Sequence, residues 1–229
     1  MATIESERLT LPPLENGDTL TWPEFERRYD AMPELKRAEL LRGVVYVASP
    51  TSYALHGDQH LDMATWLGFY KLSTPGVGGA DNATDRLDER NAPQPDLLLR
   101  IVEACGGRTR LDRKGYLHGG PELVAEAASS SASYDLGIKK DVYLEHGVAE
   151  YVVWRVFDKA IDWFVLDERE YRPLEPAGGL LRSRVFPGLW LDGKAMLKAD
   201  GKRVMEVLGQ GLASPEHAAF VEELARRRT

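Results

Sequence analysis

The sequence contains only one cysteine, Cys105, in 229 residues. A single cysteine cannot form an internal disulfide, which excludes the small disulfide-stabilised secreted folds and suits a reducing cytoplasm. The sequence also lacks any run close to the ~20 apolar residues that a membrane-spanning helix needs. Its first residues, MATIESERLT, have an acidic character and none of the apolar core of a secretory signal. We therefore expect a cytoplasmic protein that does not cross a membrane.

Basic residues are fewer than acidic ones: 29 Lys and Arg stand against 36 Asp and Glu, which gives a net charge of −7. Proteins that hold long stretches of phosphate backbone usually carry a basic surface. The composition therefore counts against broad nucleic-acid binding. The nearest approach to a basic patch is a run of four residues, Arg108, Arg110, Arg113 and Lys114. This run is compatible with a phosphate-contacting loop or with a solvated charged hairpin.

The length allows one sizeable hydrophobic core with additional segments at the ends. We expect three parts: an N-terminal arm over residues 1–20, a main domain over 21–195 and a C-terminal helical extension over 196–229. Apolar runs and period-two patterns predict strands at 44–49, 95–102, 119–129, 150–157 and 161–166. A tight turn joins the last two strands, so the sheet is at least partly antiparallel. The predicted fold class is mixed α/β.

Helices are predicted before and after these strands. They begin after Thr21, at 56, at 134 with Asp135 as N-cap and Gly147 beyond the end, and at Ser214 and Pro215. Five residues recur at spacings of four and three, which places them on one face of the second helix: His56, His60, Met63, Leu67 and Tyr70. Its two histidines are spaced to ligate a transition metal. A packed or supporting role is the simpler interpretation, because no further cysteine or histidine partner accompanies them.

Two acidic residues lie in strands that otherwise have a buried pattern. Glu126 stands among small and apolar residues, and Asp96 follows Pro95 at the head of an apolar run. A buried carboxylate needs a compensating partner, because desolvating its charge is costly. Two carboxylates from neighbouring strands suit a hard divalent cation such as Mg²⁺. In the alternative interpretation, Asp96 caps a turn and Glu126 forms a buried salt bridge.

Lysines of the helix predicted over 134–147 are candidates to neutralise these acids. Lys139 follows Leu136 by three residues and precedes Tyr143 by four, which places it on the inward face. The predicted helix start also places it in the first turn, where the helix dipole disfavours a cation. Lys140 is nearly as well placed, and periodicity does not choose between the two. For both, the alternative is a surface lysine whose ammonium group reaches solvent.

The order of several short motifs resembles one protein family. The motifs are Glu39-Leu40-x-x-Gly43, His56, Pro95-Asp96, PELVAEAASSSASYDLGIKKDVY and HGVAEYVVW. Together they are similar to the Uma-two type of restriction endonuclease, within the PD-(D/E)XK nuclease superfamily. The similarity covers roughly residues 20–190, and the serine-rich block with the segment after it is its most specific part.

The resemblance implies a restriction-endonuclease-like fold, with a mixed sheet flanked by helices, and metal-dependent hydrolysis of DNA phosphodiester bonds. It implies Mg²⁺ or Mn²⁺ as cofactor, held by Asp96 and Glu126. It also implies Lys139, and not Lys140, as the catalytic lysine, with Glu39 as an additional acid. DNA is the implied substrate. A homodimer is expected, because superfamily members that cut both strands often pair.

Two positions depart from the expected pattern. Ala128 stands two residues after the strand acid, where the superfamily usually has lysine, so the lysine would come from the helix instead. Glu122 stands where many relatives carry aspartate, and it is a candidate for a supporting acid. The acidic composition leaves two alternative functions open: a non-catalytic binding or assembly module that retains the nuclease fold, and a hydrolase of small phosphorylated substrates.

Overall fold

The computed structural model describes residues 11–48 and 52–228. Its centre is a six-stranded mixed sheet with the strand order β11-β10-β9-β8-β5-β3. Strands β8 and β9 pair in parallel, and the other neighbouring pairs are antiparallel. The strands are β3 (Val77–Asp81), β5 (Leu97–Ile101), β8 (Leu123–Ala128), β9 (Glu150–Arg155), β10 (Ala160–Asp167) and β11 (Glu170–Pro173). The predicted mixed α/β class is confirmed.

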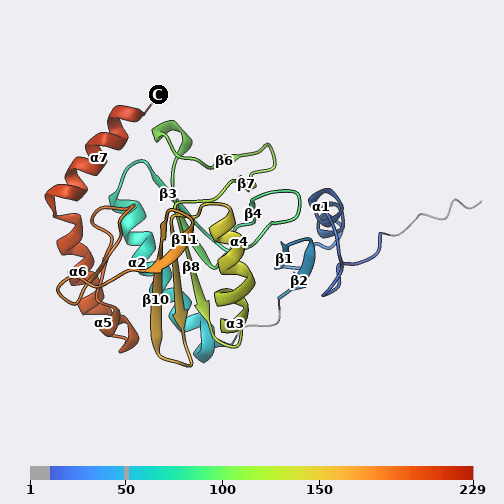
Figure 1. The fold of residues 1–229 in the computed structure, drawn as a ribbon, viewed down its shortest axis with the longest axis horizontal. Coiled ribbons are helices and arrows are strands. Elements are labelled where there is room, and N and C mark those ends of the chain that lie inside the picture. The colour runs from blue at the N-terminus through green and yellow to red at the C-terminus, as the bar shows by residue number, and fades with distance from the viewer. Residues whose placement is uncertain (1–10, 49–51, 229) are drawn as a thin grey trace, which may run out of the picture.

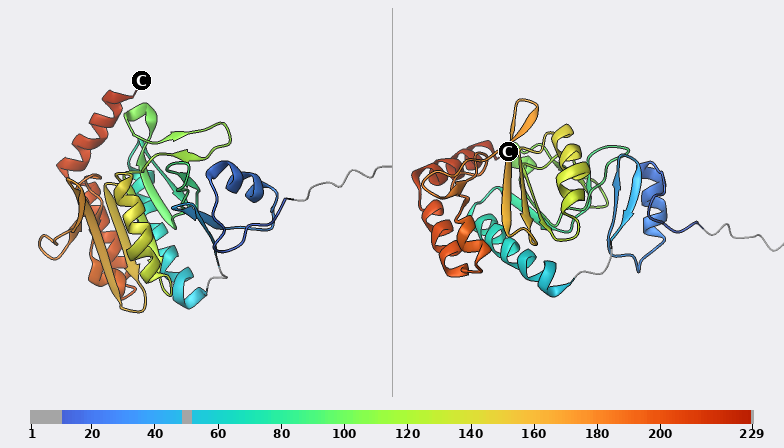
Figure 2. Two further views of the ribbon diagram at one scale, coloured as in Figure 1. Left: turned by 45° about the vertical axis from the view of Figure 1, so that its right-hand side comes forward. Right: turned by 60° about the horizontal axis from the view of Figure 1, so that its bottom comes forward.

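Helices cover both faces of this sheet (Figure 1). The long helix α2 and the C-terminal helices lie on one side, and α3 and α4 lie on the other, as both views in Figure 2 also show. Because both faces are covered, all six residues of β8 are buried. The helices are α2 (Asp58–Ser73), α3 (Ala132–Tyr134), α4 (Lys140–Glu145), α5 (Gly193–Leu197), α6 (Gly201–Leu212) and α7 (Pro215–Arg227).

An N-terminal unit, blue in Figures 1 and 2, lies beside the sheet. It consists of α1 (Trp22–Asp30) and an antiparallel hairpin of β1 (Ala38–Leu41) and β2 (Val44–Val47). Leu40 forms an isolated bridge with Ala92, a few residues before β5 begins. This bridge holds the β1–β2 hairpin against the entry to β5, which brings the residues of β1 close to the central sheet.

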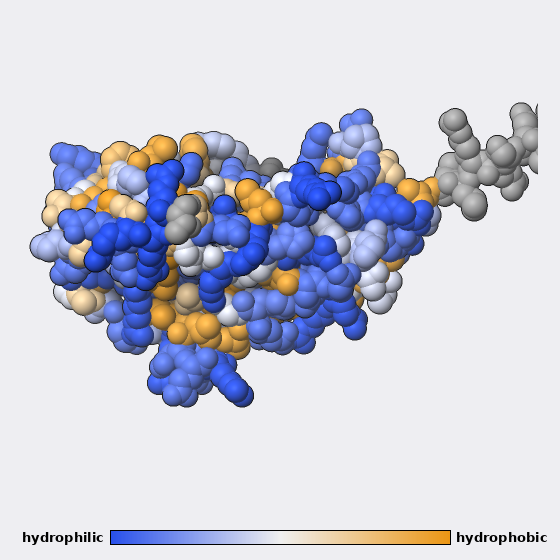
Figure 3. Space-filling view, turned by 90° about the horizontal axis from the view of Figure 1, so that it is seen from above, coloured by the Kyte–Doolittle hydropathy of each residue, from blue (hydrophilic) through white to orange (hydrophobic). Residues whose placement is uncertain are grey.

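Short strands complete the fold. A small separate sheet contains β4 (Asp85–Arg86), β6 (Arg110–Leu111) and β7 (Leu117–His118). A further pair consists of β12 (Leu181–Arg182) and β13 (Trp190–Leu191). The face seen in Figure 3 is mainly hydrophilic, with hydrophobic side chains exposed in small groups. Among the described residues, no helix has the length and apolar character needed to cross a membrane.

Several of the helix predictions are confirmed. The predicted inner face of α2 is buried at Met63, Leu67 and Tyr70. Helix α7 begins at Pro215, and the Ser214 hydroxyl accepts a hydrogen bond from the backbone N–H three residues later. These features are local, because a buried stripe and a capping residue depend on neighbours within a few positions.

The prediction for the helix over 134–147 is wrong at its start. The helix begins at Ala132, and Asp135 lies inside it, in a π turn that ends at Lys139 and continues into α4. Gly137 has a non-helical backbone (φ −102°, ψ −107°) that kinks the helix, so Lys139 lies two residues after the kink, at the start of the segment that continues into α4. Serine and aspartate are typical of turns and caps, so the sequence did not reveal the true start of the helix. The Asp135 carboxylate lies 3.8 Å from the Lys139 ammonium group. Gly147 follows the helix with a positive φ of 69°, as predicted.

Several elements were not predicted from the sequence, among them β1 and β3, whereas α6 falls inside the helical extension predicted over 196–229. Strand β3 contains two adjacent glycines, Gly78 and Gly79, a residue type that usually weakens a strand. A Cβ on Gly79 would lie only 2.9 Å from the Leu98 carbonyl oxygen of the neighbouring strand. Glycine is present here because the strands approach closely, and not because the chain turns.

Helix α6 packs closely against the chain between β12 and β13, where Gly211 of the helix contacts Gly188. A Cβ on Gly211 would lie 2.1 Å from the Gly188 carbonyl oxygen, whereas a Cβ on Gly209 would meet nothing within 4 Å. Side chains of α6 and α7 belong to the same hydrophobic core as α2 and the sheet. The division into arm, domain and extension stays a prediction, and residues 1–10 of the arm lie outside the described residues.

Replacing Gly211 with alanine should destabilise the protein, because the new methyl group would push α6 away from Gly188. We expect a loss of about 1–3 kcal/mol in the free energy of unfolding, as for other overpacked sites. Gly209→Ala is the matched control in the same helix and should stabilise the protein by up to about 1 kcal/mol. Urea unfolding followed by circular dichroism measures both changes. Equal stability of the two variants would contradict the close contact.

Candidate functional site

A cavity of about 470 Å³ opens between the β1–β2 hairpin, the adjoining ends of β5 and β8, and the segment that leads into α4. Its lining includes all four residues that the resemblance implied: Glu39, Asp96, Glu126 and Lys139. These residues are separated by up to 100 positions in the sequence, so tertiary structure alone brings them together.

Asp96 and Glu126 face each other across two antiparallel strands. The register pairs Leu97 of β5 with Ala125 of β8, so Asp96, one residue earlier, lies opposite Glu126, one residue later. Directly opposite residues in an antiparallel pair project to the same face. The Asp96 backbone N–H donates to Glu126 Oε2 at 3.2 Å, and each of the two acids is 2% exposed. The strand register therefore places both acids in one pocket.

Lys139 reaches these acids from the helix that covers the same face. Its Nζ lies 2.6 Å from Glu126 Oε1 and 3.0 Å from Glu39 Oε1. The residue is 1% exposed, so its ammonium group does not reach solvent. Lys140 points elsewhere, with its Nζ 3.6 Å from the centre of the Phe164 ring. The structure therefore places Lys139 in the cavity and Lys140 outside it.

Glu39 enters the cavity from β1 and is held by three donors. The Gln94 backbone N–H donates to Oε1 at 2.7 Å, and the Tyr134 hydroxyl donates to Oε2 at 3.3 Å. Lys139 is the third partner. Glu39 thus links the N-terminal hairpin to the helix and to the segment just before β5.

Arg37 belongs to the same group, although the sequence analysis did not identify it. Its Nη1 lies 2.7 Å from Asp96 Oδ1, and its Nη2 lies 4.0 Å from Glu126 Oε2. A signal was available, because Arg37 precedes Glu39 by two residues and strand alternation puts both on one face. The surrounding segment PELKRAEL is highly charged, which made an exposed arginine the simpler interpretation.

The two neighbouring acids differ in their affinity for protons. Burial raises the pKa of Glu126 to about 8, and Asp96 adds to this rise while Lys139 opposes it. Burial would also raise the pKa of Asp96, but the Arg37 guanidinium outweighs it and holds that pKa below its ordinary value. Asp96 is therefore ionised near neutral pH, whereas Glu126 exchanges a proton in that range.

Lys139 keeps its proton despite its burial. Desolvation alone would lower its pKa, but Glu126 and Glu39 raise the pKa above its ordinary value. Asp135 also borders the cavity, and its burial raises its pKa. Four carboxyl groups thus share the cavity with two cations, Arg37 and Lys139. With all groups ionised, two negative charges remain uncompensated, and this imbalance suits a divalent cation.

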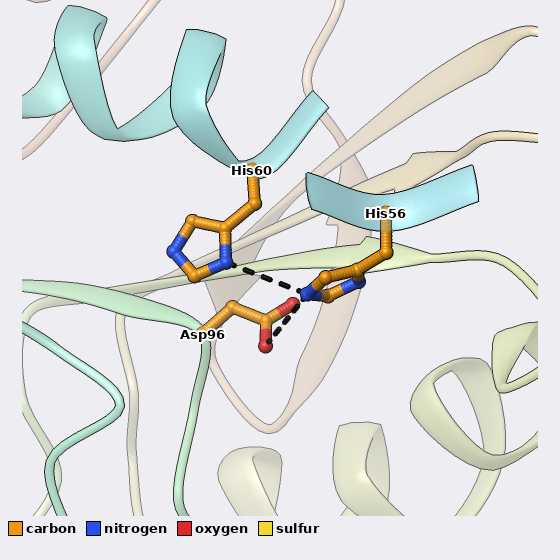
Figure 4. A group of neighbouring side chains, drawn as sticks. All are labelled: His56, His60 and Asp96. Atoms are coloured by element: carbon orange, nitrogen blue, oxygen red, sulfur yellow. Dashed lines mark hydrogen bonds and ion pairs between the residues drawn. The ribbon is translucent and has the colours of Figure 1, made fainter. Parts of the chain in front are cut away.

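A pair of histidines lies next to Asp96 (Figure 4). His56 Nδ1 lies 2.8 Å from the Ala127 carbonyl oxygen, and its Nε2 lies 3.7 Å from Asp96 Oδ1. His60 follows one turn later, with its Nδ1 3.4 Å from His56 Nε2. The predicted shared face of the two histidines is therefore confirmed, and the structure adds a carboxylate beside it.

Other residues considered from the sequence lie outside the cavity. The Glu122 carboxylate accepts a hydrogen bond from the Ile101 backbone N–H at 2.8 Å and lies 3.7 Å from Arg108. Lys114 of the basic run forms ion pairs with Glu26 and a neighbouring aspartate of α1. No residue of the basic run lines the cavity. Of the two interpretations of this run, the charged hairpin therefore agrees with the structure better than the phosphate-contacting loop.

Comparison with known proteins places these features in a family. The Uma2 family, described as "Putative restriction endonuclease", matches residues 22–194, a span that contains all four predicted site residues. No curated protein matches the chain. A crystal structure of "a putative nuclease belonging to DUF820" from Anabaena variabilis has the same fold, with a TM-score of 0.53 and 10% sequence identity over 80% of this chain and 97% of that one. At this identity the similarity concerns the fold, and it confirms the predicted nuclease-like architecture. The chain therefore belongs to the Uma2 family.

Proposed function

We propose that the protein is a nuclease that hydrolyses DNA phosphodiester bonds with the help of a divalent metal ion, Mg²⁺ or Mn²⁺. Membership of the family supports the nuclease class. The observation that carries the proposal is the meeting of Asp96 and Glu126, opposite each other on adjoining strands, with Lys139 2.6 Å from Glu126. Their shared cavity opens to the outside, so substrate can reach them.

The donor set of the cavity fits a hard divalent cation. Carboxylate oxygens are the ligands that Mg²⁺ prefers, and Asp96 and Glu126 would hold it. When bound, such an ion polarises a phosphodiester and lowers the pKa of a coordinated water. Lys139 supplies a fixed positive charge beside Glu126, where it can stabilise negative charge that develops on the phosphate. Arg37, whose side chain is 21% exposed, can turn from Asp96 toward a phosphate oxygen.

The charge distribution favours contact with few phosphates. The net charge is −7, and the basic run lies outside the cavity. A hydrolase of small phosphorylated substrates is therefore the second candidate, because such a substrate needs no extended basic surface. The homodimer expected for an enzyme that cuts both DNA strands stays a prediction.

Glu126→Gln should abolish cleavage, because glutamine keeps the shape of the side chain but cannot carry its charge. Glu122→Gln is the matched control, since Glu122 lies in the same segment, is equally buried and does not line the cavity. We expect a loss of at least about a hundredfold in rate for the first variant and little change for the second. Plasmid DNA, single-stranded DNA, RNA and nucleotides, each with Mn²⁺ or Mg²⁺, serve as substrates.

The substrate panel also decides between the two candidates. Cleavage of plasmid or single-stranded DNA supports the nuclease, and turnover of nucleotides alone supports the small-substrate hydrolase. Equal rates for Glu126→Gln and the wild type would contradict the assigned site. No turnover of any substrate with either ion would favour a module that keeps the fold without the chemistry.

Metal affinity should depend on pH because a proton competes with the ion for Glu126. The pKa of this carboxyl group is raised to about 8, so the ion must displace a proton below that pH. Affinity for Mg²⁺ should therefore rise with pH, by up to about tenfold per unit, and level off above the pKa. Isothermal titration calorimetry in buffers of different ionisation enthalpy measures both the affinity and the proton release. An affinity that is constant between about pH 6 and pH 8 would speak against Glu126 as a ligand.

Lys139→Met should destabilise the fold, because it leaves Glu126 and Glu39 buried without their shared cation. Removing one partner of a buried ion pair costs about 3–5 kcal/mol. Adding Glu126→Gln should recover much of this loss, since the double variant has one buried charge fewer. Lys140→Met is the matched control and should change the free energy of unfolding by less than about 1 kcal/mol. Chemical denaturation of the four proteins gives these values, and a similar loss for both lysine variants would refute the assignment.

A further inference from the structure

A second set of metal-binding groups meets at Asp96. His56, in the π turn Tyr53–Gly57, and His60, near the start of α2, both point toward this carboxylate (Figure 4). One nitrogen from each ring and one oxygen of Asp96 lie within 4.8 Å of one another. His56 and Asp96 also line the cavity described above, so the set can be reached from it.

The outer nitrogens of both rings are turned toward other oxygen atoms. His56 Nδ1 lies 2.8 Å from the Ala127 carbonyl oxygen, which can only accept, so Nδ1 carries the proton. In the tautomer that carries its proton on Nδ1, Nε2 has a free lone pair, and this atom faces Asp96. His60 Nε2 lies 3.2 Å from Asp81 Oδ1, without the direction of a good hydrogen bond. This carboxylate favours a proton on Nε2, which leaves the inner Nδ1 bare as well.

The direct contacts between the inner atoms are long. His60 Nδ1 and His56 Nε2 are 3.4 Å apart, which is longer than the ~2.7–3.2 Å of a normal N–H hydrogen bond. His56 Nε2 is 3.7 Å from Asp96 Oδ1. A tetrahedral ion bound to imidazole nitrogens at about 2.1 Å would hold its ligands about 3.4 Å apart. The first of these separations equals this spacing and the second exceeds it by only about 0.3 Å, so an ion can be held between the groups with little movement of the side chains.

We infer that His56, His60 and Asp96 form a binding site for a transition-metal ion, such as Mn²⁺, Co²⁺, Ni²⁺ or Zn²⁺, in preference to Mg²⁺. Imidazole nitrogens favour these ions, whereas Mg²⁺ takes oxygen ligands. The contacts of the outer nitrogens with the Ala127 carbonyl and Asp81 are of the kind that orient metal-binding histidines. The site shares Asp96 with the nuclease centre, so the use of the ion in catalysis rests on the proposed function, but its binding does not.

Binding is tested without any substrate, on the full chain free of a histidine tag. Calorimetric titrations with Co²⁺ and with Mg²⁺ give the two affinities, and pulsed electron paramagnetic resonance of bound Mn²⁺ detects nitrogen ligands directly. We expect Co²⁺ to bind at least about tenfold more tightly than Mg²⁺, with clear imidazole nitrogen couplings in the Mn²⁺ spectrum. His60→Asn should weaken Co²⁺ binding by at least about tenfold and reduce these couplings, while Mg²⁺ affinity stays unchanged.

The matched control is His146→Asn, which removes a histidine that also faces a carboxylate, with Nε2 2.9 Å from Asp88, but lies outside the cavity. This variant should bind Co²⁺ like the wild type. Equal affinities for Co²⁺ and Mg²⁺, a Mn²⁺ spectrum without nitrogen couplings, or wild-type Co²⁺ binding by folded His60→Asn would each overturn the inference. The spectrum of the wild type decides the question even where a variant does not fold.

Glu126→Gln separates this inference from the proposed function. Glu126 is not one of the three ligands, so the variant should still bind Co²⁺ more tightly than Mg²⁺ and keep the imidazole nitrogen couplings of bound Mn²⁺, while it loses DNA cleavage. Failure of the nuclease assay with intact Co²⁺ binding would refute the proposed function alone. Intact cleavage with Mg²⁺ and no preference for Co²⁺ would refute the histidine site alone.

Discussion

The buried contact between the Lys139 ammonium group and the Glu126 carboxyl group, 2.6 Å apart, is the interaction on which the architecture of the cavity depends. Burying the ammonium group without acidic partners would cost several kcal/mol of desolvation. The same ammonium group also contacts Glu39 of β1, 3.0 Å away. One buried cation therefore ties together three separate parts of the chain: the N-terminal hairpin, the central sheet and the helix on its face. A change in any of these parts alters the surroundings of both acids.

The charges around this pair are compensated unequally. Arg37 keeps Asp96 ionised, whereas burial raises the pKa of Glu126 to about 8. Adjacent acids with different protonation are typical of sites that bind a cation or transfer protons. The cavity is negative when all four of its carboxyl groups are ionised, and the chain as a whole has a net charge of −7. The charge distribution thus favours binding of a cation in the cavity over contact with many phosphates of a nucleic acid.

Asp96 occupies the point where two kinds of ligand meet. On one side lie the carboxylates of the cavity, and on the other lie His56, just before α2, and His60, near the start of α2. Its carboxylate also accepts a hydrogen bond from the Ala127 backbone N–H at 2.8 Å, which fixes its orientation at the edge of β8. A side chain held in this way has little freedom to move. The metal-binding groups on both sides of Asp96 therefore have a preformed arrangement.

Local patterns in the sequence indicated the mixed α/β class and singled out Asp96, Glu126 and the two lysines Lys139 and Lys140, and the family resemblance then chose Lys139. These features depend on alternation and helical period within a few residues, and the family motifs added Glu39. The pairing of Arg37 with Asp96, 59 residues apart, and the meeting of that carboxylate with two histidines followed no local pattern. They arise from strand register and from the packing of the hairpin and α2 against the sheet. Contacts of this kind depend on the free energy of the whole fold, which no short segment of sequence contains.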